Sequence, residues 1–131
     1  MYDFRTNEVG ETAPEEIAKL LRSIGASGRL LGFDYTVYIV HSITNRKSGR
    51  HQMTKSIYPS TASYFNVSAS SVERAVRTLI ASCWDRYDHS DLNRVAGIEL
   101  EDMPTNSEFI DILVAYLSYG AYDRTDNKIR I

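Results

Sequence analysis

Apolar side chains recur with a helical period near the start of the chain. The residues that repeat every three or four positions are Ile17, Leu20, Leu21 and Ile24. This spacing places them on one face of a helix. Thr12 and Glu15 fit a capping box at its start, and Pro14 suits its first turn. The pattern therefore predicts a helix that begins after Thr12 and ends at Gly25.

Residues 29–43 are apolar on nearly every side. Periodicity alone does not separate a buried helix from a buried strand in such a run. The β-branched and aromatic content favours a strand. The length of the run, and the lack of another convincing strand to pair with it, favour a helix. We therefore expect a helix that is buried on several sides.

A further helix is predicted over residues 54–65, with a tight turn after it. Pro59 falls within this helix, and proline is tolerated in a first turn but would kink a helix interior. The residues expected on its inner face are Ile57, Tyr58, Thr61 and Phe65. Asn66 and Val67 then form a tight turn before the next helical pattern.

The helix over residues 69–85 has the clearest pattern in the chain. Its unbroken apolar stripe consists of Val72, Ala75, Val76, Leu79, Ile80 and Cys83. Its opposite face carries Ser70, Arg74, Arg77 and Ala81. Ser68 or Ser70 can cap its start, and Ser70 with Glu73 would form a capping box. This helix is expected to bury one side and to expose a basic one.

A short helix over 91–96 and a longer one over 105–119 are predicted in the last third of the chain. Thr105 and Glu108 fit a capping box at the start of the longer helix. Its apolar residues cover more than one face. Such a helix is either buried on two sides within one subunit or shared with a second subunit. A homodimer through residues 105–119 is therefore one of two interpretations.

Together these patterns predict an all-α fold of about six helices. We expect a loose segment over 1–12, one helical domain over 13–120 and a tail over 121–131. The 131 residues, of which 43% are hydrophobic, suffice for one domain with a core. No apolar run approaches the roughly 18 residues of a membrane span, and no secretion leader opens the chain. The single cysteine excludes an internal disulfide framework, so we expect a cytoplasmic protein without a membrane partner.

The net charge of −2 is unevenly distributed along the sequence. Residues 1–43 carry four Lys or Arg and six Asp or Glu, whereas residues 44–94 carry eight and four. Residues 95–131 carry three and seven. The middle segment is therefore +4 between flanks of −2 and −4, and it is the segment suited to face phosphates.

A short helix, a tight turn and a longer helix with a basic face are typical of a helix-turn-helix, whose second helix enters the DNA major groove. Arg74 and Arg77 are candidate base contacts, because the planar arginine fork can donate two hydrogen bonds to guanine. The small Ser70 would let the backbone approach phosphates closely. The candidate phosphate contacts are Arg46, Lys47, Arg50 and Lys55. A helical hairpin without a DNA-binding role remains the alternative interpretation.

Three segments resemble one known family. YPSTASYFNVSASSVERAVRTLIASCW at 58–84 resembles the DNA-binding effector domain of the stage-zero sporulation protein A family. PTNSEFI at 104–110 is similar to the start of the last helix of that domain. IGASGRLLGFDY at 24–35 falls within the same likeness, which extends from about Glu16 through Leu117.

The resemblance implies an all-helical domain in which 54–65 and 69–85 form the helix-turn-helix. It implies that the Val-Glu-Arg segment faces DNA, and the residues carried over are Ser70, Glu73, Arg74 and Arg77. Glu73 would then accept a hydrogen bond from cytosine N4 or orient Arg74. The resemblance also implies a dimer on tandem DNA sites, with the last helix near the contact.

The sequence departs from the family at several positions. Ser71, a further candidate DNA contact, stands where the family has a basic residue. Glu99, Glu101 and Asp102 stand where the family is rich in lysine. Fewer phosphate contacts would lower the affinity for DNA. No receiver domain precedes the matched segment, so we expect the aspartate phosphorylation switch to be absent. These departures favour an alternative, a protein-interaction module of the same fold that modulates a related regulator without productive DNA binding.

The other reactive residue types indicate structural roles. Cys83 lies in the apolar stripe with no base beside it. The three histidines, His41, His51 and His89, have no zinc-ligand spacing. Asp85, Asp88 and Asp91 lack the glycine of a calcium loop. We therefore expect no enzyme activity, no metal, no other cofactor and no small-molecule substrate.

Overall fold

The computed structural model describes residues 12–45 and 56–119, together with the backbone of 122–123 and 128–129. The α-helices in this part of the chain are α1 (Pro14–Ser23), α2 (Leu31–Thr44), α3 (Ile57–Phe65), α4 (Ala69–Trp84), α5 (Ser90–Ala96) and α6 (Asn106–Ser118). A 3-10 helix, η2 (Arg86–His89), joins α4 to α5. After α6, β1 (Tyr122–Asp123) pairs antiparallel with β2 (Lys128–Ile129), where the sequence predicted only a tail. The all-α fold class is confirmed.

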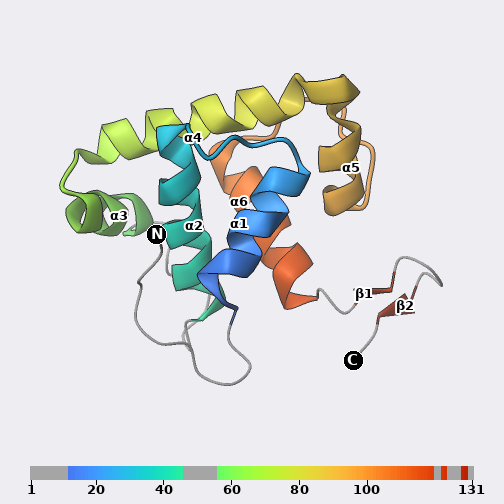
Figure 1. Ribbon diagram of the computed structural model, residues 1–131, viewed down its shortest axis with the longest axis horizontal. Coiled ribbons are helices and arrows are strands. Elements are labelled where there is room, and N and C mark those ends of the chain that lie inside the picture. The colour runs from blue at the N-terminus through green and yellow to red at the C-terminus, as the bar shows by residue number, and fades with distance from the viewer. Residues whose placement is uncertain (1–11, 46–55, 120–121, 124–127, 130–131) are drawn as a thin grey trace.

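Helix α4 lies across one edge of the molecule, with α3 near its beginning and α5 near its end (Figure 1). Helices α1, α2 and α6 lie beneath it. Helix α2 packs against α1, α4 and α6, which explains why nearly every side of this segment is apolar. Its buried residues include Phe33, Val37, Ile39 and Val40, so the prediction of a buried helix over 29–43 is confirmed.

Two of the capping boxes predicted from the sequence differ from the helix starts in the structure. Helix α1 begins at Pro14, and the N–H of Ala13 donates to the carboxylate of Glu16 at 3.2 Å. The predicted capping box of Thr12 with Glu15 is therefore wrong by one residue. Thr12 instead bonds to the side chain of Asn45 at the end of α2, through its N–H at 2.9 Å and its carbonyl at 3.1 Å. A contact between segments distant in sequence overrides the local motif.

The capping box predicted from Ser70 is also wrong, because Ser70 lies inside α4. Ser68 caps this helix and accepts a hydrogen bond from the N–H of Ser71 at 3.1 Å. The capping box of Thr105 with Glu108 is confirmed at the start of α6, with reciprocal hydrogen bonds of 2.9 and 3.2 Å.

Helix α3 is described from Ile57, and the predicted start at Thr54 lies outside the described residues. Pro59 is the third residue of this helix, within the first turn. The N–H groups of a first turn have no intrahelical acceptor, so the missing proline donor leaves the helix intact.

Helices α2 and α4 approach each other so closely that only glycine fits at one position. A Cβ atom added to Gly32 would lie 2.3 Å from the carbonyl oxygen of Ala75 and 3.2 Å from the Cβ of Leu79. The first of these neighbours is a backbone atom and cannot rotate away. The missing side chain at Gly32 therefore sets the separation of the two helices.

We expect Gly32→Ala to lower the free energy of unfolding by about 1–3 kcal/mol, because overpacking outweighs the better helix propensity of alanine. Gly28→Ala is the matched control, since nothing lies within 4 Å of a Cβ added there. Urea unfolding followed by circular dichroism measures both. Equal stability of the two variants would show that the close approach imposes no constraint.

Candidate nucleic-acid interface

The turn between α3 and α4 is three residues long and closes on Asn66. This residue has a left-handed backbone, with φ 60° and ψ 48°, a conformation that asparagine tolerates better than most residues. The N–H of Val67 donates to the carbonyl of Ala62 at 2.9 Å and so satisfies the end of α3. The tight turn expected at Asn66 and Val67 is confirmed.

Helix α4 has the two faces that its sequence predicts. Its buried residues are Val72, Val76, Leu79, Ile80 and Cys83. The candidate DNA-contacting residues of this helix are all exposed, namely Ser70, Ser71, Glu73, Arg74 and Arg77. Because the buried stripe fixes the rotation of the helix, these five side chains project away from the core.

Three serines lie together at the exposed start of α4. The hydroxyl of Ser68 donates to the hydroxyl of Ser71 at 2.8 Å and lies 3.3 Å from that of Ser70. The N-terminal end of a helix also carries a partial positive charge. Small hydroxyl side chains at such an end leave room for an anionic group to approach the backbone.

One flank of the exposed face of α4 is organised by Glu73. Its carboxylate lies 3.6 Å from the guanidinium of Arg77, one helical turn later. The sequence left two roles open for Glu73, to accept from cytosine N4 or to orient Arg74, and in this structure its ion pair is made with Arg77. Asn106 at the start of α6 donates to the carbonyl of Glu73 at 3.0 Å. Burial raises the pKa of Tyr58 from α3 beside this contact, and a hydrogen bond with Asn106 opposes the shift.

Arg74 lies on the other flank, in a groove that also contains Ser71 and Thr78. Within residues 12–45 and 56–119, no carboxylate lies within ion-pair distance of its guanidinium. The same groove contains Arg29, from the loop between α1 and α2. Arg29 was not predicted from the sequence, because nothing in the local pattern shows that this loop returns to α4.

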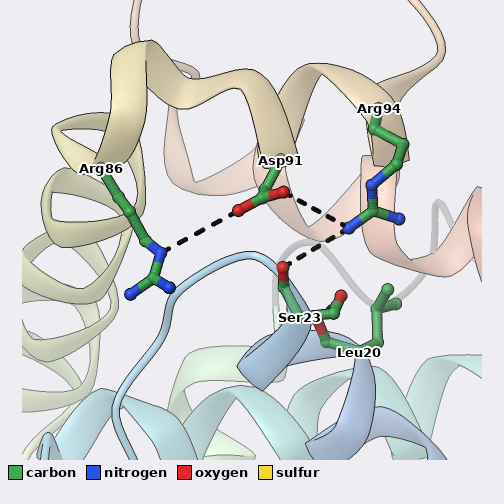
Figure 2. A network of polar contacts seen from close by, with 5 residues as sticks. All are labelled: Leu20, Ser23, Arg86, Asp91 and Arg94. Atoms are coloured by element: carbon green, nitrogen blue, oxygen red, sulfur yellow. Dashed lines mark hydrogen bonds and ion pairs between the residues drawn. The ribbon is translucent and has the colours of Figure 1, made fainter.

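The predicted phosphate contacts Arg46, Lys47, Arg50 and Lys55 lie outside the described residues. Two other arginines of the basic middle segment take part in structural contacts away from the exposed face of α4. Figure 2 shows Asp91 between Arg86, at 3.9 Å, and Arg94, at 3.8 Å. Arg94 also donates to the carbonyl of Ser23 at 3.4 Å, which attaches α5 to the end of α1.

The chain reverses direction between α4 and α5 through three successive left-handed residues. Tyr87, Asp88 and His89 have φ angles of 49°, 57° and 50°. The ring of His89 stacks on Trp84, with 3.5 Å between the ring centroids and 5° between the planes. This contact between α4 and its own exit turn contributes to offsetting the unfavourable backbone of the reversal.

Other kinds of site find no support in the described part of the chain. Among those residues, no group of three His, Cys, Asp or Glu side chains is placed to hold a metal ion. Likewise, none of the helices described is long and apolar enough to cross a membrane. Cys83 is buried, and burial raises the pKa of its thiol to about 11. A thiol of that pKa is a poor nucleophile at neutral pH.

The fold and the exposed face define a class of protein, the small all-α domains in which one helix exposes arginines on the side opposite its buried stripe. Residues 17–117 match the family described as Sporulation initiation factor Spo0A C terminal. The match covers more than half of the chain, and the chain belongs to this family. The family is a DNA-binding effector domain of a sporulation regulator, rather than a catalytic one.

We expect Cys83 to react with a thiol reagent at pH 8 at least about a hundredfold more slowly in the folded protein than in urea. The thiol pKa is raised from 9.0 to about 11, and pH 8 lies below both values, so the folded protein has about a hundredfold less of the reactive thiolate. Burial of the side chain slows the reaction further, because it blocks access of the reagent. Stopped-flow labelling with a chromogenic disulfide measures both rates. Similar rates in the two states would show that the α4 stripe does not bury this residue.

Proposed function

We propose that the domain is a sequence-specific transcriptional regulator that binds duplex DNA. In this proposal α3, the turn at Asn66 and α4 act as a helix-turn-helix, and α4 enters the major groove. The observation that carries the proposal is the exposed face of α4, which presents Arg74 and Arg77 from a helix seated by a buried apolar stripe. Membership of a DNA-binding family supports the same conclusion.

The two arginines have different surroundings and therefore different proposed roles. Arg74 faces no carboxylate among the described residues, so its two-pronged donor is available for guanine O6 and N7. Arg77 is paired with Glu73, and that carboxylate has a further oxygen that can accept from cytosine N4. Arg74 is the better candidate for the main base contact.

Phosphate contacts would position the helix without reading sequence. The hydroxyls of Ser70 and Ser71 at the start of α4 fit such contacts. Arg46, Lys47, Arg50 and Lys55, in the basic segment before α3, remain the proposed sources of further contacts. Because each is a cation, they would raise affinity for all DNA sequences alike.

A second candidate function is favoured by a surface on α5 and α6. Ile112, Tyr116 and Tyr119 of the α6 side line a groove with Ile98, which is 64% exposed. We propose that a second copy of the domain packs here. The same groove carries Arg94 together with Glu99 and Asp111. Opposite charges on one surface suit a twofold interface, where the cation of one copy faces the carboxylates of the other.

The interaction-module alternative uses this surface without DNA. The exposed acidic residues Glu99, Glu101 and Asp102 follow α5, and they would repel phosphates but not a protein partner. A mixed dimer with a related regulator would then be the product. This alternative predicts association through the α5–α6 groove and no function for Arg74.

We expect Arg74→Ala to lower affinity for the preferred duplex by about 1–3 kcal/mol and to leave affinity for scrambled duplex nearly unchanged. Lys19→Ala, which removes an exposed cation of α1, is the control and should retain the preference. Sites selected from a random duplex pool are titrated in competition at several salt concentrations. No binding by the wild-type domain at low salt, even to selected sites, would exclude the proposed function. Full site preference in a folded Arg74→Ala variant would remove Arg74 from the base-reading role.

We expect Ile98→Glu to reduce cooperative binding to tandem sites at least about tenfold, because it would bury an unpaired charge between two copies. The side chain of Ile98 is exposed, so the single domain should fold normally. Ser118→Glu adds the same charge at an exposed position outside the groove and should be neutral. Sedimentation and two-site titrations measure the effect, and equal cooperativity in both variants would place the dimer contact elsewhere.

A further inference from the structure

A groove that carries two arginines borders the exposed face of α4. It lies between the start of α2 and the α4 flank that carries Ser71, Arg74 and Thr78. Among residues 12–45 and 56–119, its charged lining residues are Arg29 and Arg74, both of them exposed, and no acidic residue of these ranges lines it. A surface of this kind attracts an anion and offers it no competing carboxylate.

The position of Arg29 is fixed by its own turn. Its N–H donates to the hydroxyl of Ser27 at 3.1 Å, and the N–H of Leu30 donates to the carbonyl of Ser27 at 3.1 Å. These bonds order the turn that carries Arg29, two residues before the first residue of α2. Gly32 lets the start of α2 lie against the backbone at Ala75, so this turn lies next to α4. Arg29 therefore lies on the same groove as Arg74.

We propose that this groove receives the sugar–phosphate backbone that borders the major groove, and that Arg29 holds one of its phosphates. The proposal rests on the proposed function, since it requires α4 to lie in duplex DNA. Arg74 belongs both to this groove and to the face proposed to read bases, and Ser71, a proposed phosphate contact, lines the same groove. An anion bound in this groove would therefore lie directly beside DNA bound on α4. This position favours a phosphate of the same DNA over an unrelated acidic peptide.

Leu31 limits the strength of this phosphate site. It lies on the same groove and is 72% exposed, so its apolar side chain contributes little to the core. A cation at this position would stand at the first residue of α2, near Arg29. The site therefore allows tests in both directions, one variant that removes charge and one that adds it.

In the test, wild type, Arg29→Ala, Leu31→Lys, Arg74→Ala and the control Lys19→Ala are titrated with selected and scrambled duplexes at several salt concentrations. Each neutralised phosphate contributes roughly −0.9 to the slope of log K against log salt, which is about eightfold in affinity between 1 M and 0.1 M salt. At 0.1 M salt, Arg29→Ala should bind both duplexes about eightfold more weakly than wild type. Its plot of log K against log salt should be less steep by about one unit. Leu31→Lys should shift affinity and slope by a similar amount in the opposite direction.

The outcomes separate this inference from the function on which it rests. If wild type binds neither duplex, the DNA-binding function itself fails. If wild type binds and Arg74→Ala loses site preference, while Arg29→Ala and Leu31→Lys both match Lys19→Ala, only the groove proposal is overturned. If Arg29→Ala removes preference for the selected site without weakening binding to scrambled duplex, the groove reads bases, and the phosphate role is likewise overturned.

Discussion

The contact between Gly32 and the carbonyl of Ala75 is the constraint on which the arrangement around α4 depends. It lets the backbones of α2 and α4 meet without a side chain between them. The buried face of α4 is then fully used by the core, and the opposite face is left for solvent. A larger residue at position 32 would shift α4 away from α2 and would also change the groove that contains Arg29 and Arg74.

The place of each charged residue in the fold matters more in this protein than the net charge of its sequence segment. The basic middle segment supplies Arg74 and Arg77 to the exposed face of α4, but it also supplies Arg86 and Arg94 to contacts with Asp91. Arg94 also contacts the carbonyl of Ser23 at the end of α1, while the buried Leu92 and Val95 seat α5 on the core. Meanwhile Arg29, from the acidic first segment, joins the α4 surface. A segment-by-segment charge count therefore includes the two exposed arginines of α4 but misses Arg29, which lies on the same surface.

Elements with a repeating pattern could be predicted from the sequence, and contacts between distant segments could not. The two faces of α4 follow from its stripe, and the capping box at Thr105 follows from residues three apart. Thr12 matched the same local rule, yet it bonds to Asn45, which lies 33 positions later. Glu73 was expected to accept from cytosine N4 or to orient Arg74, and the helical spacing of four residues places its carboxylate against Arg77. No local sequence pattern marks Arg29, because only the fold brings the loop before α2 next to α4.

The hydrogen bond from Asn106 to the carbonyl of Glu73 has a consequence for the thermodynamics of recognition. It ties the first half of α4 to the start of α6, before any ligand is present. A recognition element that is already ordered loses little conformational entropy on association. Such an element also resists tilting to accommodate an incorrect partner, and this preorganisation would widen the affinity gap between matched and mismatched sequences.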